Sequence, residues 1–207
     1  MDEDERRVQT NTQTPGTPGQ TPDTALMCAV RDGDVSRLGV LFERHHGRLF
    51  NLFRRLGASA GNAEDLVQEV FFRMLKYRNN FRDDGDFLPW MYQLARNVSA
   101  DHYRKHGRDV QAPEDPPEQP DVQPLAPETL ERDEASRRMR RALQSLPPEK
   151  REVLVLSRYQ SLKYEQIAEL LGCSVGAVKL RVHRAIKDLR DAYHGEFAGA
   201  GAGEGSL

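Results

Sequence analysis

The stretch SVGAVKLRVHRAIKDL, residues 174–189, has a spacing of apolar residues that predicts the fold of the carboxyl-terminal part of the chain. At about 100° of rotation per residue, its apolar side chains fall within one narrow stripe of an α-helix. The opposite side is slim and basic, because residues 175–190 hold five Lys or Arg and one Asp, a net +4, against −2 for the whole chain. The stripe predicts a buried face formed by Val175, Val178, Val182, Ile186 and Leu189.

A tight turn joins this helix to a second helix before it. Ser174 can cap the later helix by accepting a hydrogen bond from an early N–H, and Gly172 suits a left-handed residue that ends the earlier one. The earlier helix reads YEQIAELL, residues 164–171. Together they predict a helix-turn-helix unit, whose second helix enters the DNA major groove. An ordinary amphipathic hairpin with a solvated basic face is the alternative that so short a match leaves open.

Composition narrows the class of protein. The chain has 207 residues, 38% hydrophobic and 30% charged, which fits one or two folded domains. No segment approaches the roughly 20 apolar residues that span a membrane, and the polar amino end does not resemble a signal peptide. We therefore expect a cytoplasmic protein without membrane insertion. Cys28 and Cys173 have no metal-ligand spacing, so we expect reduced thiols and no metal site.

Apolar residues recur every three or four positions rather than every two, which predicts an all-α fold. We expect two helical domains, at residues 25–106 and 131–193. Between them, residues 107–130 are rich in proline, and residues 108–134 contain nine acidic and two basic side chains. This composition predicts a flexible, acidic linker. Residues 1–24 and 194–207 are expected to be a disordered tail and a flexible tail.

The stretch NAEDLVQEVFFRMLKY, residues 62–77, predicts a helix with one apolar side, and Asn62 can cap it. The remaining surface is acidic and can dock a basic partner. The alternative is a solvated surface with i, i+4 ion pairs such as Glu69–Arg73. The apolar side consists of Leu66, Val70, Phe71, Met74 and Leu75.

The next segment, residues 81–108, mixes aromatic, amide and basic side chains. Rings such as Phe87 and Trp90 precede Asn97 and Arg104. Single-stranded DNA binds such mixtures, because bases stack on rings and phosphates pair with cations. The alternative is that the rings form a helix-packed core, and for Trp90 we expect the core.

Three blocks together resemble the extracytoplasmic-function class of bacterial sigma factors. They are AEDLVQEVFFRML (residues 63–75), FLPWMYQLARNVSADHYRK (residues 87–105) and residues 146–189, in matching order and spacing. The resemblance covers residues 25–106 and 131–192. It implies a subunit that is not an enzyme, needs no cofactor, and directs core RNA polymerase to promoters in response to a stress or envelope signal. It also implies two domains, called region 2 and region 4, and an anti-sigma factor as a partner.

The resemblance also implies roles for residues of region 2. The helix of residues 63–75 would bind the coiled coil of the largest polymerase subunit. The loop of residues 82–86, with Phe87 and Asn97, would line a pocket for a flipped base of the minus-ten element, while Arg96 and Arg104 would hold the DNA backbone. The implied polymerase contacts are Asp65, Leu66, Gln68, Glu69 and Phe72.

In region 4, the resemblance implies that the helix after Ser174 reads the minus-thirty-five element. Two departures from the family stand out. Leu180 occupies a position that usually holds a small hydroxyl residue, and Lys163 replaces a capping Ser or Thr, so Gln166 is expected to lack its reciprocal partner. The implied phosphate contacts are Ser174, Lys179 and Arg181, and the implied base contacts are Ala177, Leu180 and Arg184.

The linker is long enough for this role. About 20 base pairs between the two contact regions, at about 3.4 Å each, correspond to a separation of about 70 Å. The segment of residues 107–130, fully extended at about 3.3 Å per residue, spans up to about 80 Å. One chain can therefore reach both elements.

Two other functions fit parts of the sequence. An autonomous helix-turn-helix regulator would bind its promoter tightly without polymerase. A helical metalloenzyme could be built on DHYRKH, where His102 and His106 lie at i, i+4 near Asp101, with His45 and His46 as further ligands. No general-base motif or phosphate-binding loop accompanies these histidines.

Overall fold

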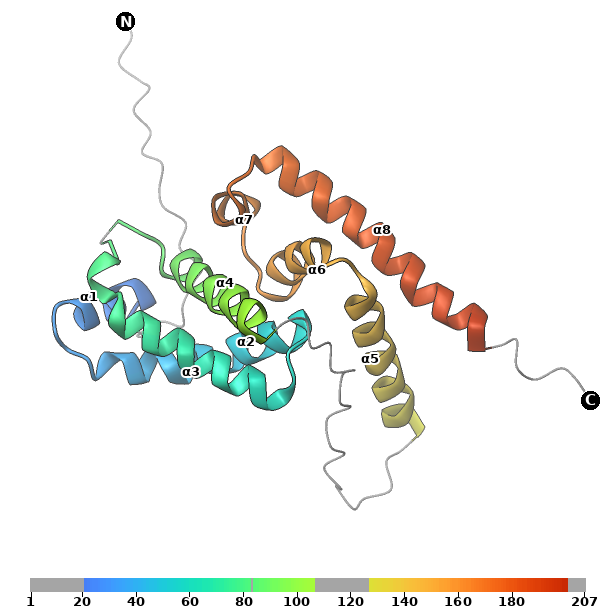
Figure 1. Cartoon of the computed structure of the whole chain (residues 1–207), viewed down its shortest axis with the longest axis horizontal. Coiled ribbons are helices and arrows are strands. Elements are labelled where there is room, and N and C mark those ends of the chain that lie inside the picture. Colours follow the sequence, from blue (N-terminus) through green and yellow to red (C-terminus); the bar gives the residue numbers. More distant parts are fainter. Residues whose placement is uncertain (1–20, 83, 107–126, 201–207) are drawn as a thin grey trace, which may run out of the picture.

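The computed structural model describes residues 21–82, 84–106 and 127–200, and within these ranges every regular element is a helix (Figure 1). The all-α prediction is confirmed for this part of the chain. The first unit comprises α1 (Asp23–Arg31), α2 (Arg37–Leu56), α3 (Ala60–Lys76), the short 3₁₀ helix η1 (Arg78–Asn80) and α4 (Phe87–His106). The second unit comprises α5 (Pro127–Ser145), α6 (Pro148–Leu154), the π-helical turn η2 (Val155–Tyr159), α7 (Tyr164–Leu171) and α8 (Val175–Ala200).

In the first unit, α2 packs against α1 and α3, and α3 packs against α4. Each helix contributes large apolar side chains to a shared core, and burying one such side chain contributes about 1.5–3 kcal/mol. The apolar side that the sequence predicted for α3 is buried, apart from the partly exposed Leu75. Fully buried side chains of this core include Met27, Leu41, Leu49, Phe53, Met74 and Met91.

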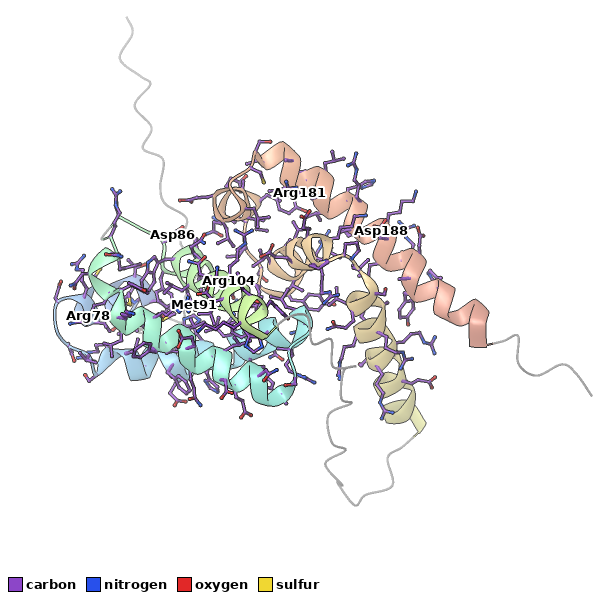
Figure 2. The ribbon with its side chains drawn as sticks, in the orientation of Figure 1. Arg78, Asp86, Met91, Arg104, Arg181 and Asp188 are labelled. Carbon is purple, nitrogen blue, oxygen red and sulfur yellow. The ribbon has the colours of Figure 1, made fainter. Side chains whose placement is uncertain are left out.

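In the second unit, α8 crosses α5, α6 and α7. Val178 and Val182 of the predicted stripe are buried, and the other three members pack partly buried against the core. Ala185, which the stripe did not include, is fully buried as well. An ion pair between Lys150 and Asp188 joins α6 to α8, and Figure 2 shows the position of Asp188 on α8.

The helix ends confirm some predicted caps and correct others. Gly172 adopts the left-handed conformation, with φ 61°, and the Ser174 hydroxyl accepts a hydrogen bond from the Ala177 N–H at 3.2 Å, as predicted. The cap of α3 is Ser59 rather than Asn62: α3 begins at Ala60, so the Ser59 hydroxyl accepts a hydrogen bond from the Asn62 N–H at 3.2 Å.

At the start of α7, the expected loss of a partner for Gln166 is wrong. The Gln166 side-chain oxygen accepts a hydrogen bond from the Lys163 N–H at 3.0 Å. This is one half of a capping box, and it needs only the backbone of the cap residue. A lysine at the cap position therefore still allows the hydrogen bond from its backbone N–H to the Gln166 side chain.

Several helices extend beyond the segments expected from composition. α1 begins at Asp23, α5 begins at Pro127, and α8 continues to Ala200, so parts of the expected linker and tails are helical. Proline at the first position of α5 is compatible with a helix start, because that position needs no N–H donor. The rest of the expected linker and tails, residues 1–20, 107–126 and 201–207, lies outside the described residues.

The two units are in contact. The sequence had predicted two helical domains joined by a flexible linker, without a contact between them. α7 lies beside α4 (Figure 1), and α5, α6 and η2 contact α2. The buried apolar residues form one cluster with members from both units. At the centre of this contact, the Tyr92 hydroxyl donates to the side-chain oxygen of Gln160 at 2.7 Å.

Candidate nucleic-acid interface

The outer face of α8 is exposed and basic. Lys179, Arg181 and Arg184 lie on it, and Leu180 is 48% exposed between them. Figure 2 shows Arg181 on α8, where its guanidinium lies 3.8 Å from the Cys173 sulfur. The structure therefore brings the predicted recognition residues onto one accessible face.

Two other predicted residues lie at the amino end of this face. The Ser174 hydroxyl is engaged in capping α8, and Ala177 is half-buried one turn into the helix. A small residue there lets the helix approach a groove closely, because no long side chain intervenes.

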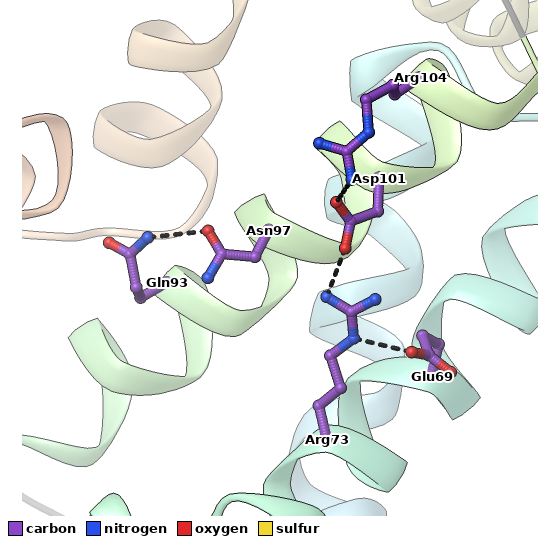
Figure 3. A network of polar contacts seen from close by, with 6 residues as sticks. All are labelled: Glu69, Arg73, Gln93, Asn97, Asp101 and Arg104. Atoms are coloured by element: carbon purple, nitrogen blue, oxygen red, sulfur yellow. Dashed lines mark hydrogen bonds and ion pairs between the residues drawn. The ribbon is translucent and has the colours of Figure 1, made fainter.

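On α4, the predicted DNA contacts differ in their surroundings. Arg104 is exposed and pairs with Asp101 at 2.7 Å. Asn97 is exposed, and its side-chain oxygen accepts a hydrogen bond from Gln93 at 3.1 Å (Figure 3). Arg96 instead pairs with Glu152 of α6, in the second unit, at 3.0 Å.

A chain of ion pairs connects α3 to α4 (Figure 3). Arg73 pairs with Glu69 at 2.7 Å, as the sequence suggested, and with Asp101 at 2.9 Å. The hydrogen bond from Arg73 is the main cause that lowers the pKa of Asp101 below its usual value. Asp101 therefore stays ionised and holds both Arg73 and Arg104.

The prediction that Phe87 lines a base pocket is not compatible with this structure. Its side chain is only 2% exposed, and its ring packs near those of His45, Phe81 and Trp90, with centroids 5.1–6.5 Å apart. Phe87 is a core residue because these rings, which come from α2, from the segment after η1 and from α4 itself, surround its side chain. Trp90, expected in the core, is partly buried in the same cluster.

The loop before α4 presents charged side chains. Arg82 is exposed and makes a two-pronged contact with Asp84, with both N–O distances 3.0 Å. Asp86 accepts a hydrogen bond from the Gln166 side chain of α7 at 3.2 Å. This end of the predicted promoter loop is therefore tied to the second unit.

On α3, four of the five predicted polymerase contacts are accessible. Asp65 and Gln68 are exposed, Glu69 is partly exposed, and Phe72 is 58% exposed. Leu66 is only 5% exposed and belongs to the core, so its predicted role as an apolar contact is wrong for this conformation. Leu66 was predicted both as part of the apolar side of this helix and as a polymerase contact, and in the structure it packs in the core.

A pocket that sequence reasoning missed lies beside this surface, between α2 and α3. Its volume is about 430 Å³, and its lining includes the apolar side chains of Phe42, Phe50 and Val67 and the polar side chains of Glu64 and Gln68. The spacing of Phe42 and Phe50, on one side of α2, was the available signal. The accessible side of α3 therefore continues into an apolar hollow.

Within the described ranges, no group of three His, Cys, Asp or Glu side chains is placed to hold a metal ion. His45 instead contacts Asp23 at 2.8 Å, and the His46 Nδ1 lies 2.9 Å from the Phe42 carbonyl oxygen. Nor is any helix in the described part of the chain long and apolar enough to cross a bilayer.

The described residues form a helical protein in which α7 and α8 make a helix-turn-helix with an exposed, basic second helix. A family model described as sigma-70 region 2 matches residues 41–109, and one described as sigma-70, region 4 matches residues 136–189. RNA polymerase sigma factor CarQ of Myxococcus xanthus is 34% identical over 161 residues, which cover 78% of this chain and 91% of CarQ. The ECF RNA polymerase sigma factor SigE of Mycolicibacterium smegmatis is 35% identical over 153 residues, 73% of this chain and 59% of SigE.

Among solved structures, CnrH in complex with the cytosolic domain of CnrY superposes with a TM-score of 0.64 and 26% identity, covering 81% of this chain and 94% of CnrH. The chain belongs to the sigma-70 family, in its extracytoplasmic-function class of RNA polymerase sigma factors. It is therefore a sigma factor and not an autonomous helix-turn-helix regulator.

Proposed function

We propose that the second unit, region 4, reads the minus-thirty-five promoter element through the outer face of α8. The observation that carries this proposal is the exposed row of cations on a helix whose other side is locked into the core. Arg184 can bind guanine with two hydrogen bonds, worth about 1–3 kcal/mol of discrimination, while Leu180 offers an apolar contact such as a thymine methyl. Ala177 would lie against base edges, and Ser174, Lys179 and Arg181 would hold phosphates.

The first unit, region 2, would open and hold the minus-ten element. Asn97 and the loop that contains Arg82 are exposed and would contact the unpaired strand, while Arg96 and Arg104 would hold its backbone. Phe87 would support this surface from the core rather than touch a base, because it is buried.

The accessible side of α3 would dock on the coiled coil of the largest polymerase subunit. Phe72 is exposed beside acidic and amide side chains, which is the composition of an interface with an apolar centre and a polar rim. Asp65, Gln68 and Glu69 would be the polar contacts.

Other parts of the proposal follow from family membership. The protein would act in the cytoplasm, where core polymerase and the chromosome are found, as an initiation factor without catalytic residues or a cofactor. An anti-sigma factor would hold it until a stress or envelope signal arrives. The division into region 2 at residues 25–106, a linker at 107–130 and region 4 at 131–193 is part of the same proposal.

Transcription in vitro with core polymerase and a random promoter pool tests the proposal. We expect initiation at a subset of promoters, and Arg184→Ala should impair recognition chiefly at one minus-thirty-five position. Equal loss on all sequences would assign Arg184 to phosphates instead. Glu69→Lys should weaken binding to core polymerase, whereas the matched reversal Glu134→Lys on α5 should not. If no promoter were selected, the proposed function would be wrong.

A further inference from the structure

Two amide side chains form a pair on the surface of α4. The Gln93 amide nitrogen donates to the Asn97 side-chain oxygen at 3.1 Å, and the two residues lie four positions apart on one face of the helix (Figure 3). Asn97 is exposed, whereas Gln93 is half-buried. Asn97 is therefore the member of the pair that a ligand reaches more readily, and Gln93 supports it.

The hydrogen bond within this pair fixes which way the Asn97 amide faces. An unrestrained Asn amide can turn over, because its last side-chain torsion has two broad and nearly equivalent minima. Gln93 engages the oxygen, and among the described residues the Asn97 amide nitrogen has no hydrogen-bond partner. The group that Asn97 offers to a ligand is therefore its pair of N–H donors.

The basic side chains nearby do not supply base discrimination. Arg96 pairs with Glu152 and Arg104 pairs with Asp101, and both arginines are proposed to hold the DNA backbone. Contacts to phosphates position a protein on DNA but carry no sequence information of their own. On this face of α4, the choice of base therefore depends on how the Asn97 amide is oriented.

An N–H donor at this position distinguishes two classes of base. Thymine and guanine present a keto oxygen, which accepts a hydrogen bond, where cytosine and adenine present an amino group, which donates one. An unpaired or flipped base exposes this edge to the protein. A keto oxygen can bind the Asn97 N–H group, whereas an amino group in the same place leaves two donors facing each other, both without a partner.

We propose that Gln93 is a positioning residue for base selection in the minus-ten element. By holding the Asn97 oxygen, it points the Asn97 amide hydrogens at the unpaired strand and favours a base with a keto oxygen, T or G, at that place. Gln93 acts through Asn97 and does not itself contact the base. The inference rests on the proposed function, in which Asn97 contacts this strand.

Two substitutions of Gln93 hold the Asn97 amide in opposite orientations. Gln93→Lys only donates, so it engages the Asn97 oxygen as Gln93 does, whereas the carboxylate of Gln93→Glu only accepts, so it engages the amide nitrogen and leaves the oxygen outward. Lys and Glu are both good helix formers, so α4 is retained, and circular dichroism checks this. We expect Gln93→Lys to keep the wild-type base preference and Gln93→Glu to shift it about fivefold toward A or C, which corresponds to one hydrogen bond.

Transcription in vitro measures this preference with the full chain, core polymerase and a promoter pool randomised in the minus-ten element. Each preference is a ratio between bases for one protein, so the different net charges of the two variants cancel. Asn97→Ala identifies the position of the element that Asn97 reads. In a chain that already carries Asn97→Ala, neither substitution of Gln93 should change any base preference, and this double substitution is the control.

Several results would overturn the inference. An unchanged preference in a folded Gln93→Glu chain would show that the pair does not orient Asn97, and a reversal by Gln93→Lys instead would show the opposite orientation. A shift that persists without Asn97 would mean that residue 93 contacts the base itself. An Asn97→Ala chain that selects the same bases as the wild type would remove Asn97, and this inference with it, from the site.

Two further outcomes complete the test. If Gln93→Glu does not fold, Gln93→Met replaces it, because Met keeps the length of the side chain but lacks the amide donor; the preference of the wild type should then weaken, and an unchanged preference would overturn the inference. Failure of the proposed function looks different, because the wild-type chain with core polymerase would then select no promoter at all.

Discussion

Arg151 donates hydrogen bonds both to the end of α2 in the first unit and to the connection between α5 and α6 in the second. Its removal therefore tests how much the contact between the units contributes to stability. It donates hydrogen bonds to the carbonyl oxygens of Leu56 at 2.9 Å, Leu143 at 3.1 Å and Leu146 at 3.0 Å. It also donates to the backbone and side-chain oxygens of Gln144. Burial lowers the pKa of this guanidinium, and none of these acceptors carries a negative charge.

We expect Arg151→Ala to lower the free energy of unfolding by about 3 kcal/mol. A hydrogen bond from a charged group contributes about 1.5–3 kcal/mol, and the losses do not add fully, because Arg151 is half-buried and water can reach part of the space. Arg151→Lys keeps the charge but loses the planar set of donors, so its free energy of unfolding should lie between those of the wild type and Arg151→Ala.

Urea unfolding followed by circular dichroism and by the fluorescence of Trp90 measures this loss. Trp90 is the chain's single tryptophan and lies in the first unit, whereas Arg151 lies in the second, so a shift of both signals together shows that the units unfold as one. The exposed Arg158→Ala is the matched control, expected within about 0.5 kcal/mol of wild type. A loss below about 1 kcal/mol for Arg151→Ala would refute the reasoning.

Three further predictions concern local structure. Ser59→Ala should lower the free energy of unfolding by about 1 kcal/mol, because α3 loses its cap; an unchanged urea midpoint would contradict this. Gly172→Ala should cost about 1 kcal/mol, since φ is 61° there, whereas Gly47→Ala inside α2, with open space around its Cβ position, should stabilise the protein. Burial alone would raise the pKa of Asp23, but hydrogen bonds from His45 and Arg44 outweigh it and lower that pKa. Its stabilisation is therefore complete above about pH 4 and lost as pH falls through the lowered pKa, so the melting temperatures of wild type and Asp23→Asn should converge in acid.

The predicted site divides into residues that the sequence placed well and residues that it did not. The exposed face of α8 was predicted correctly, because periodicity alone separates the buried stripe from Lys179, Leu180 and Arg184, whose role in recognition stays a prediction. Phe87 was placed poorly, because its burial depends on His45 and Phe81, which are distant in sequence. A motif identifies such a residue as important without saying whether it touches the ligand.

The caps show the same division on a smaller scale. Ser174 and Gly172 were correct because only one residue of each type stood at the boundary. At α3, both Ser59 and Asn62 can cap, and the start of the helix at Ala60 selected Ser59. The residue at which the helix begins therefore determines which of two possible residues caps it, and composition alone does not fix that residue.

By itself, the sequence determined the helices, the helix-turn-helix and the family, because these depend on spacings of three or four residues and on motifs read within single segments. Only the tertiary structure decided that the units pack together. The contacts that join them, from Arg96 to Glu152 and from Gln160 to the Arg48 carbonyl, connect residues 56 to 112 positions apart. Such partners are chosen by how whole helix surfaces fit, and no local pattern encodes that choice.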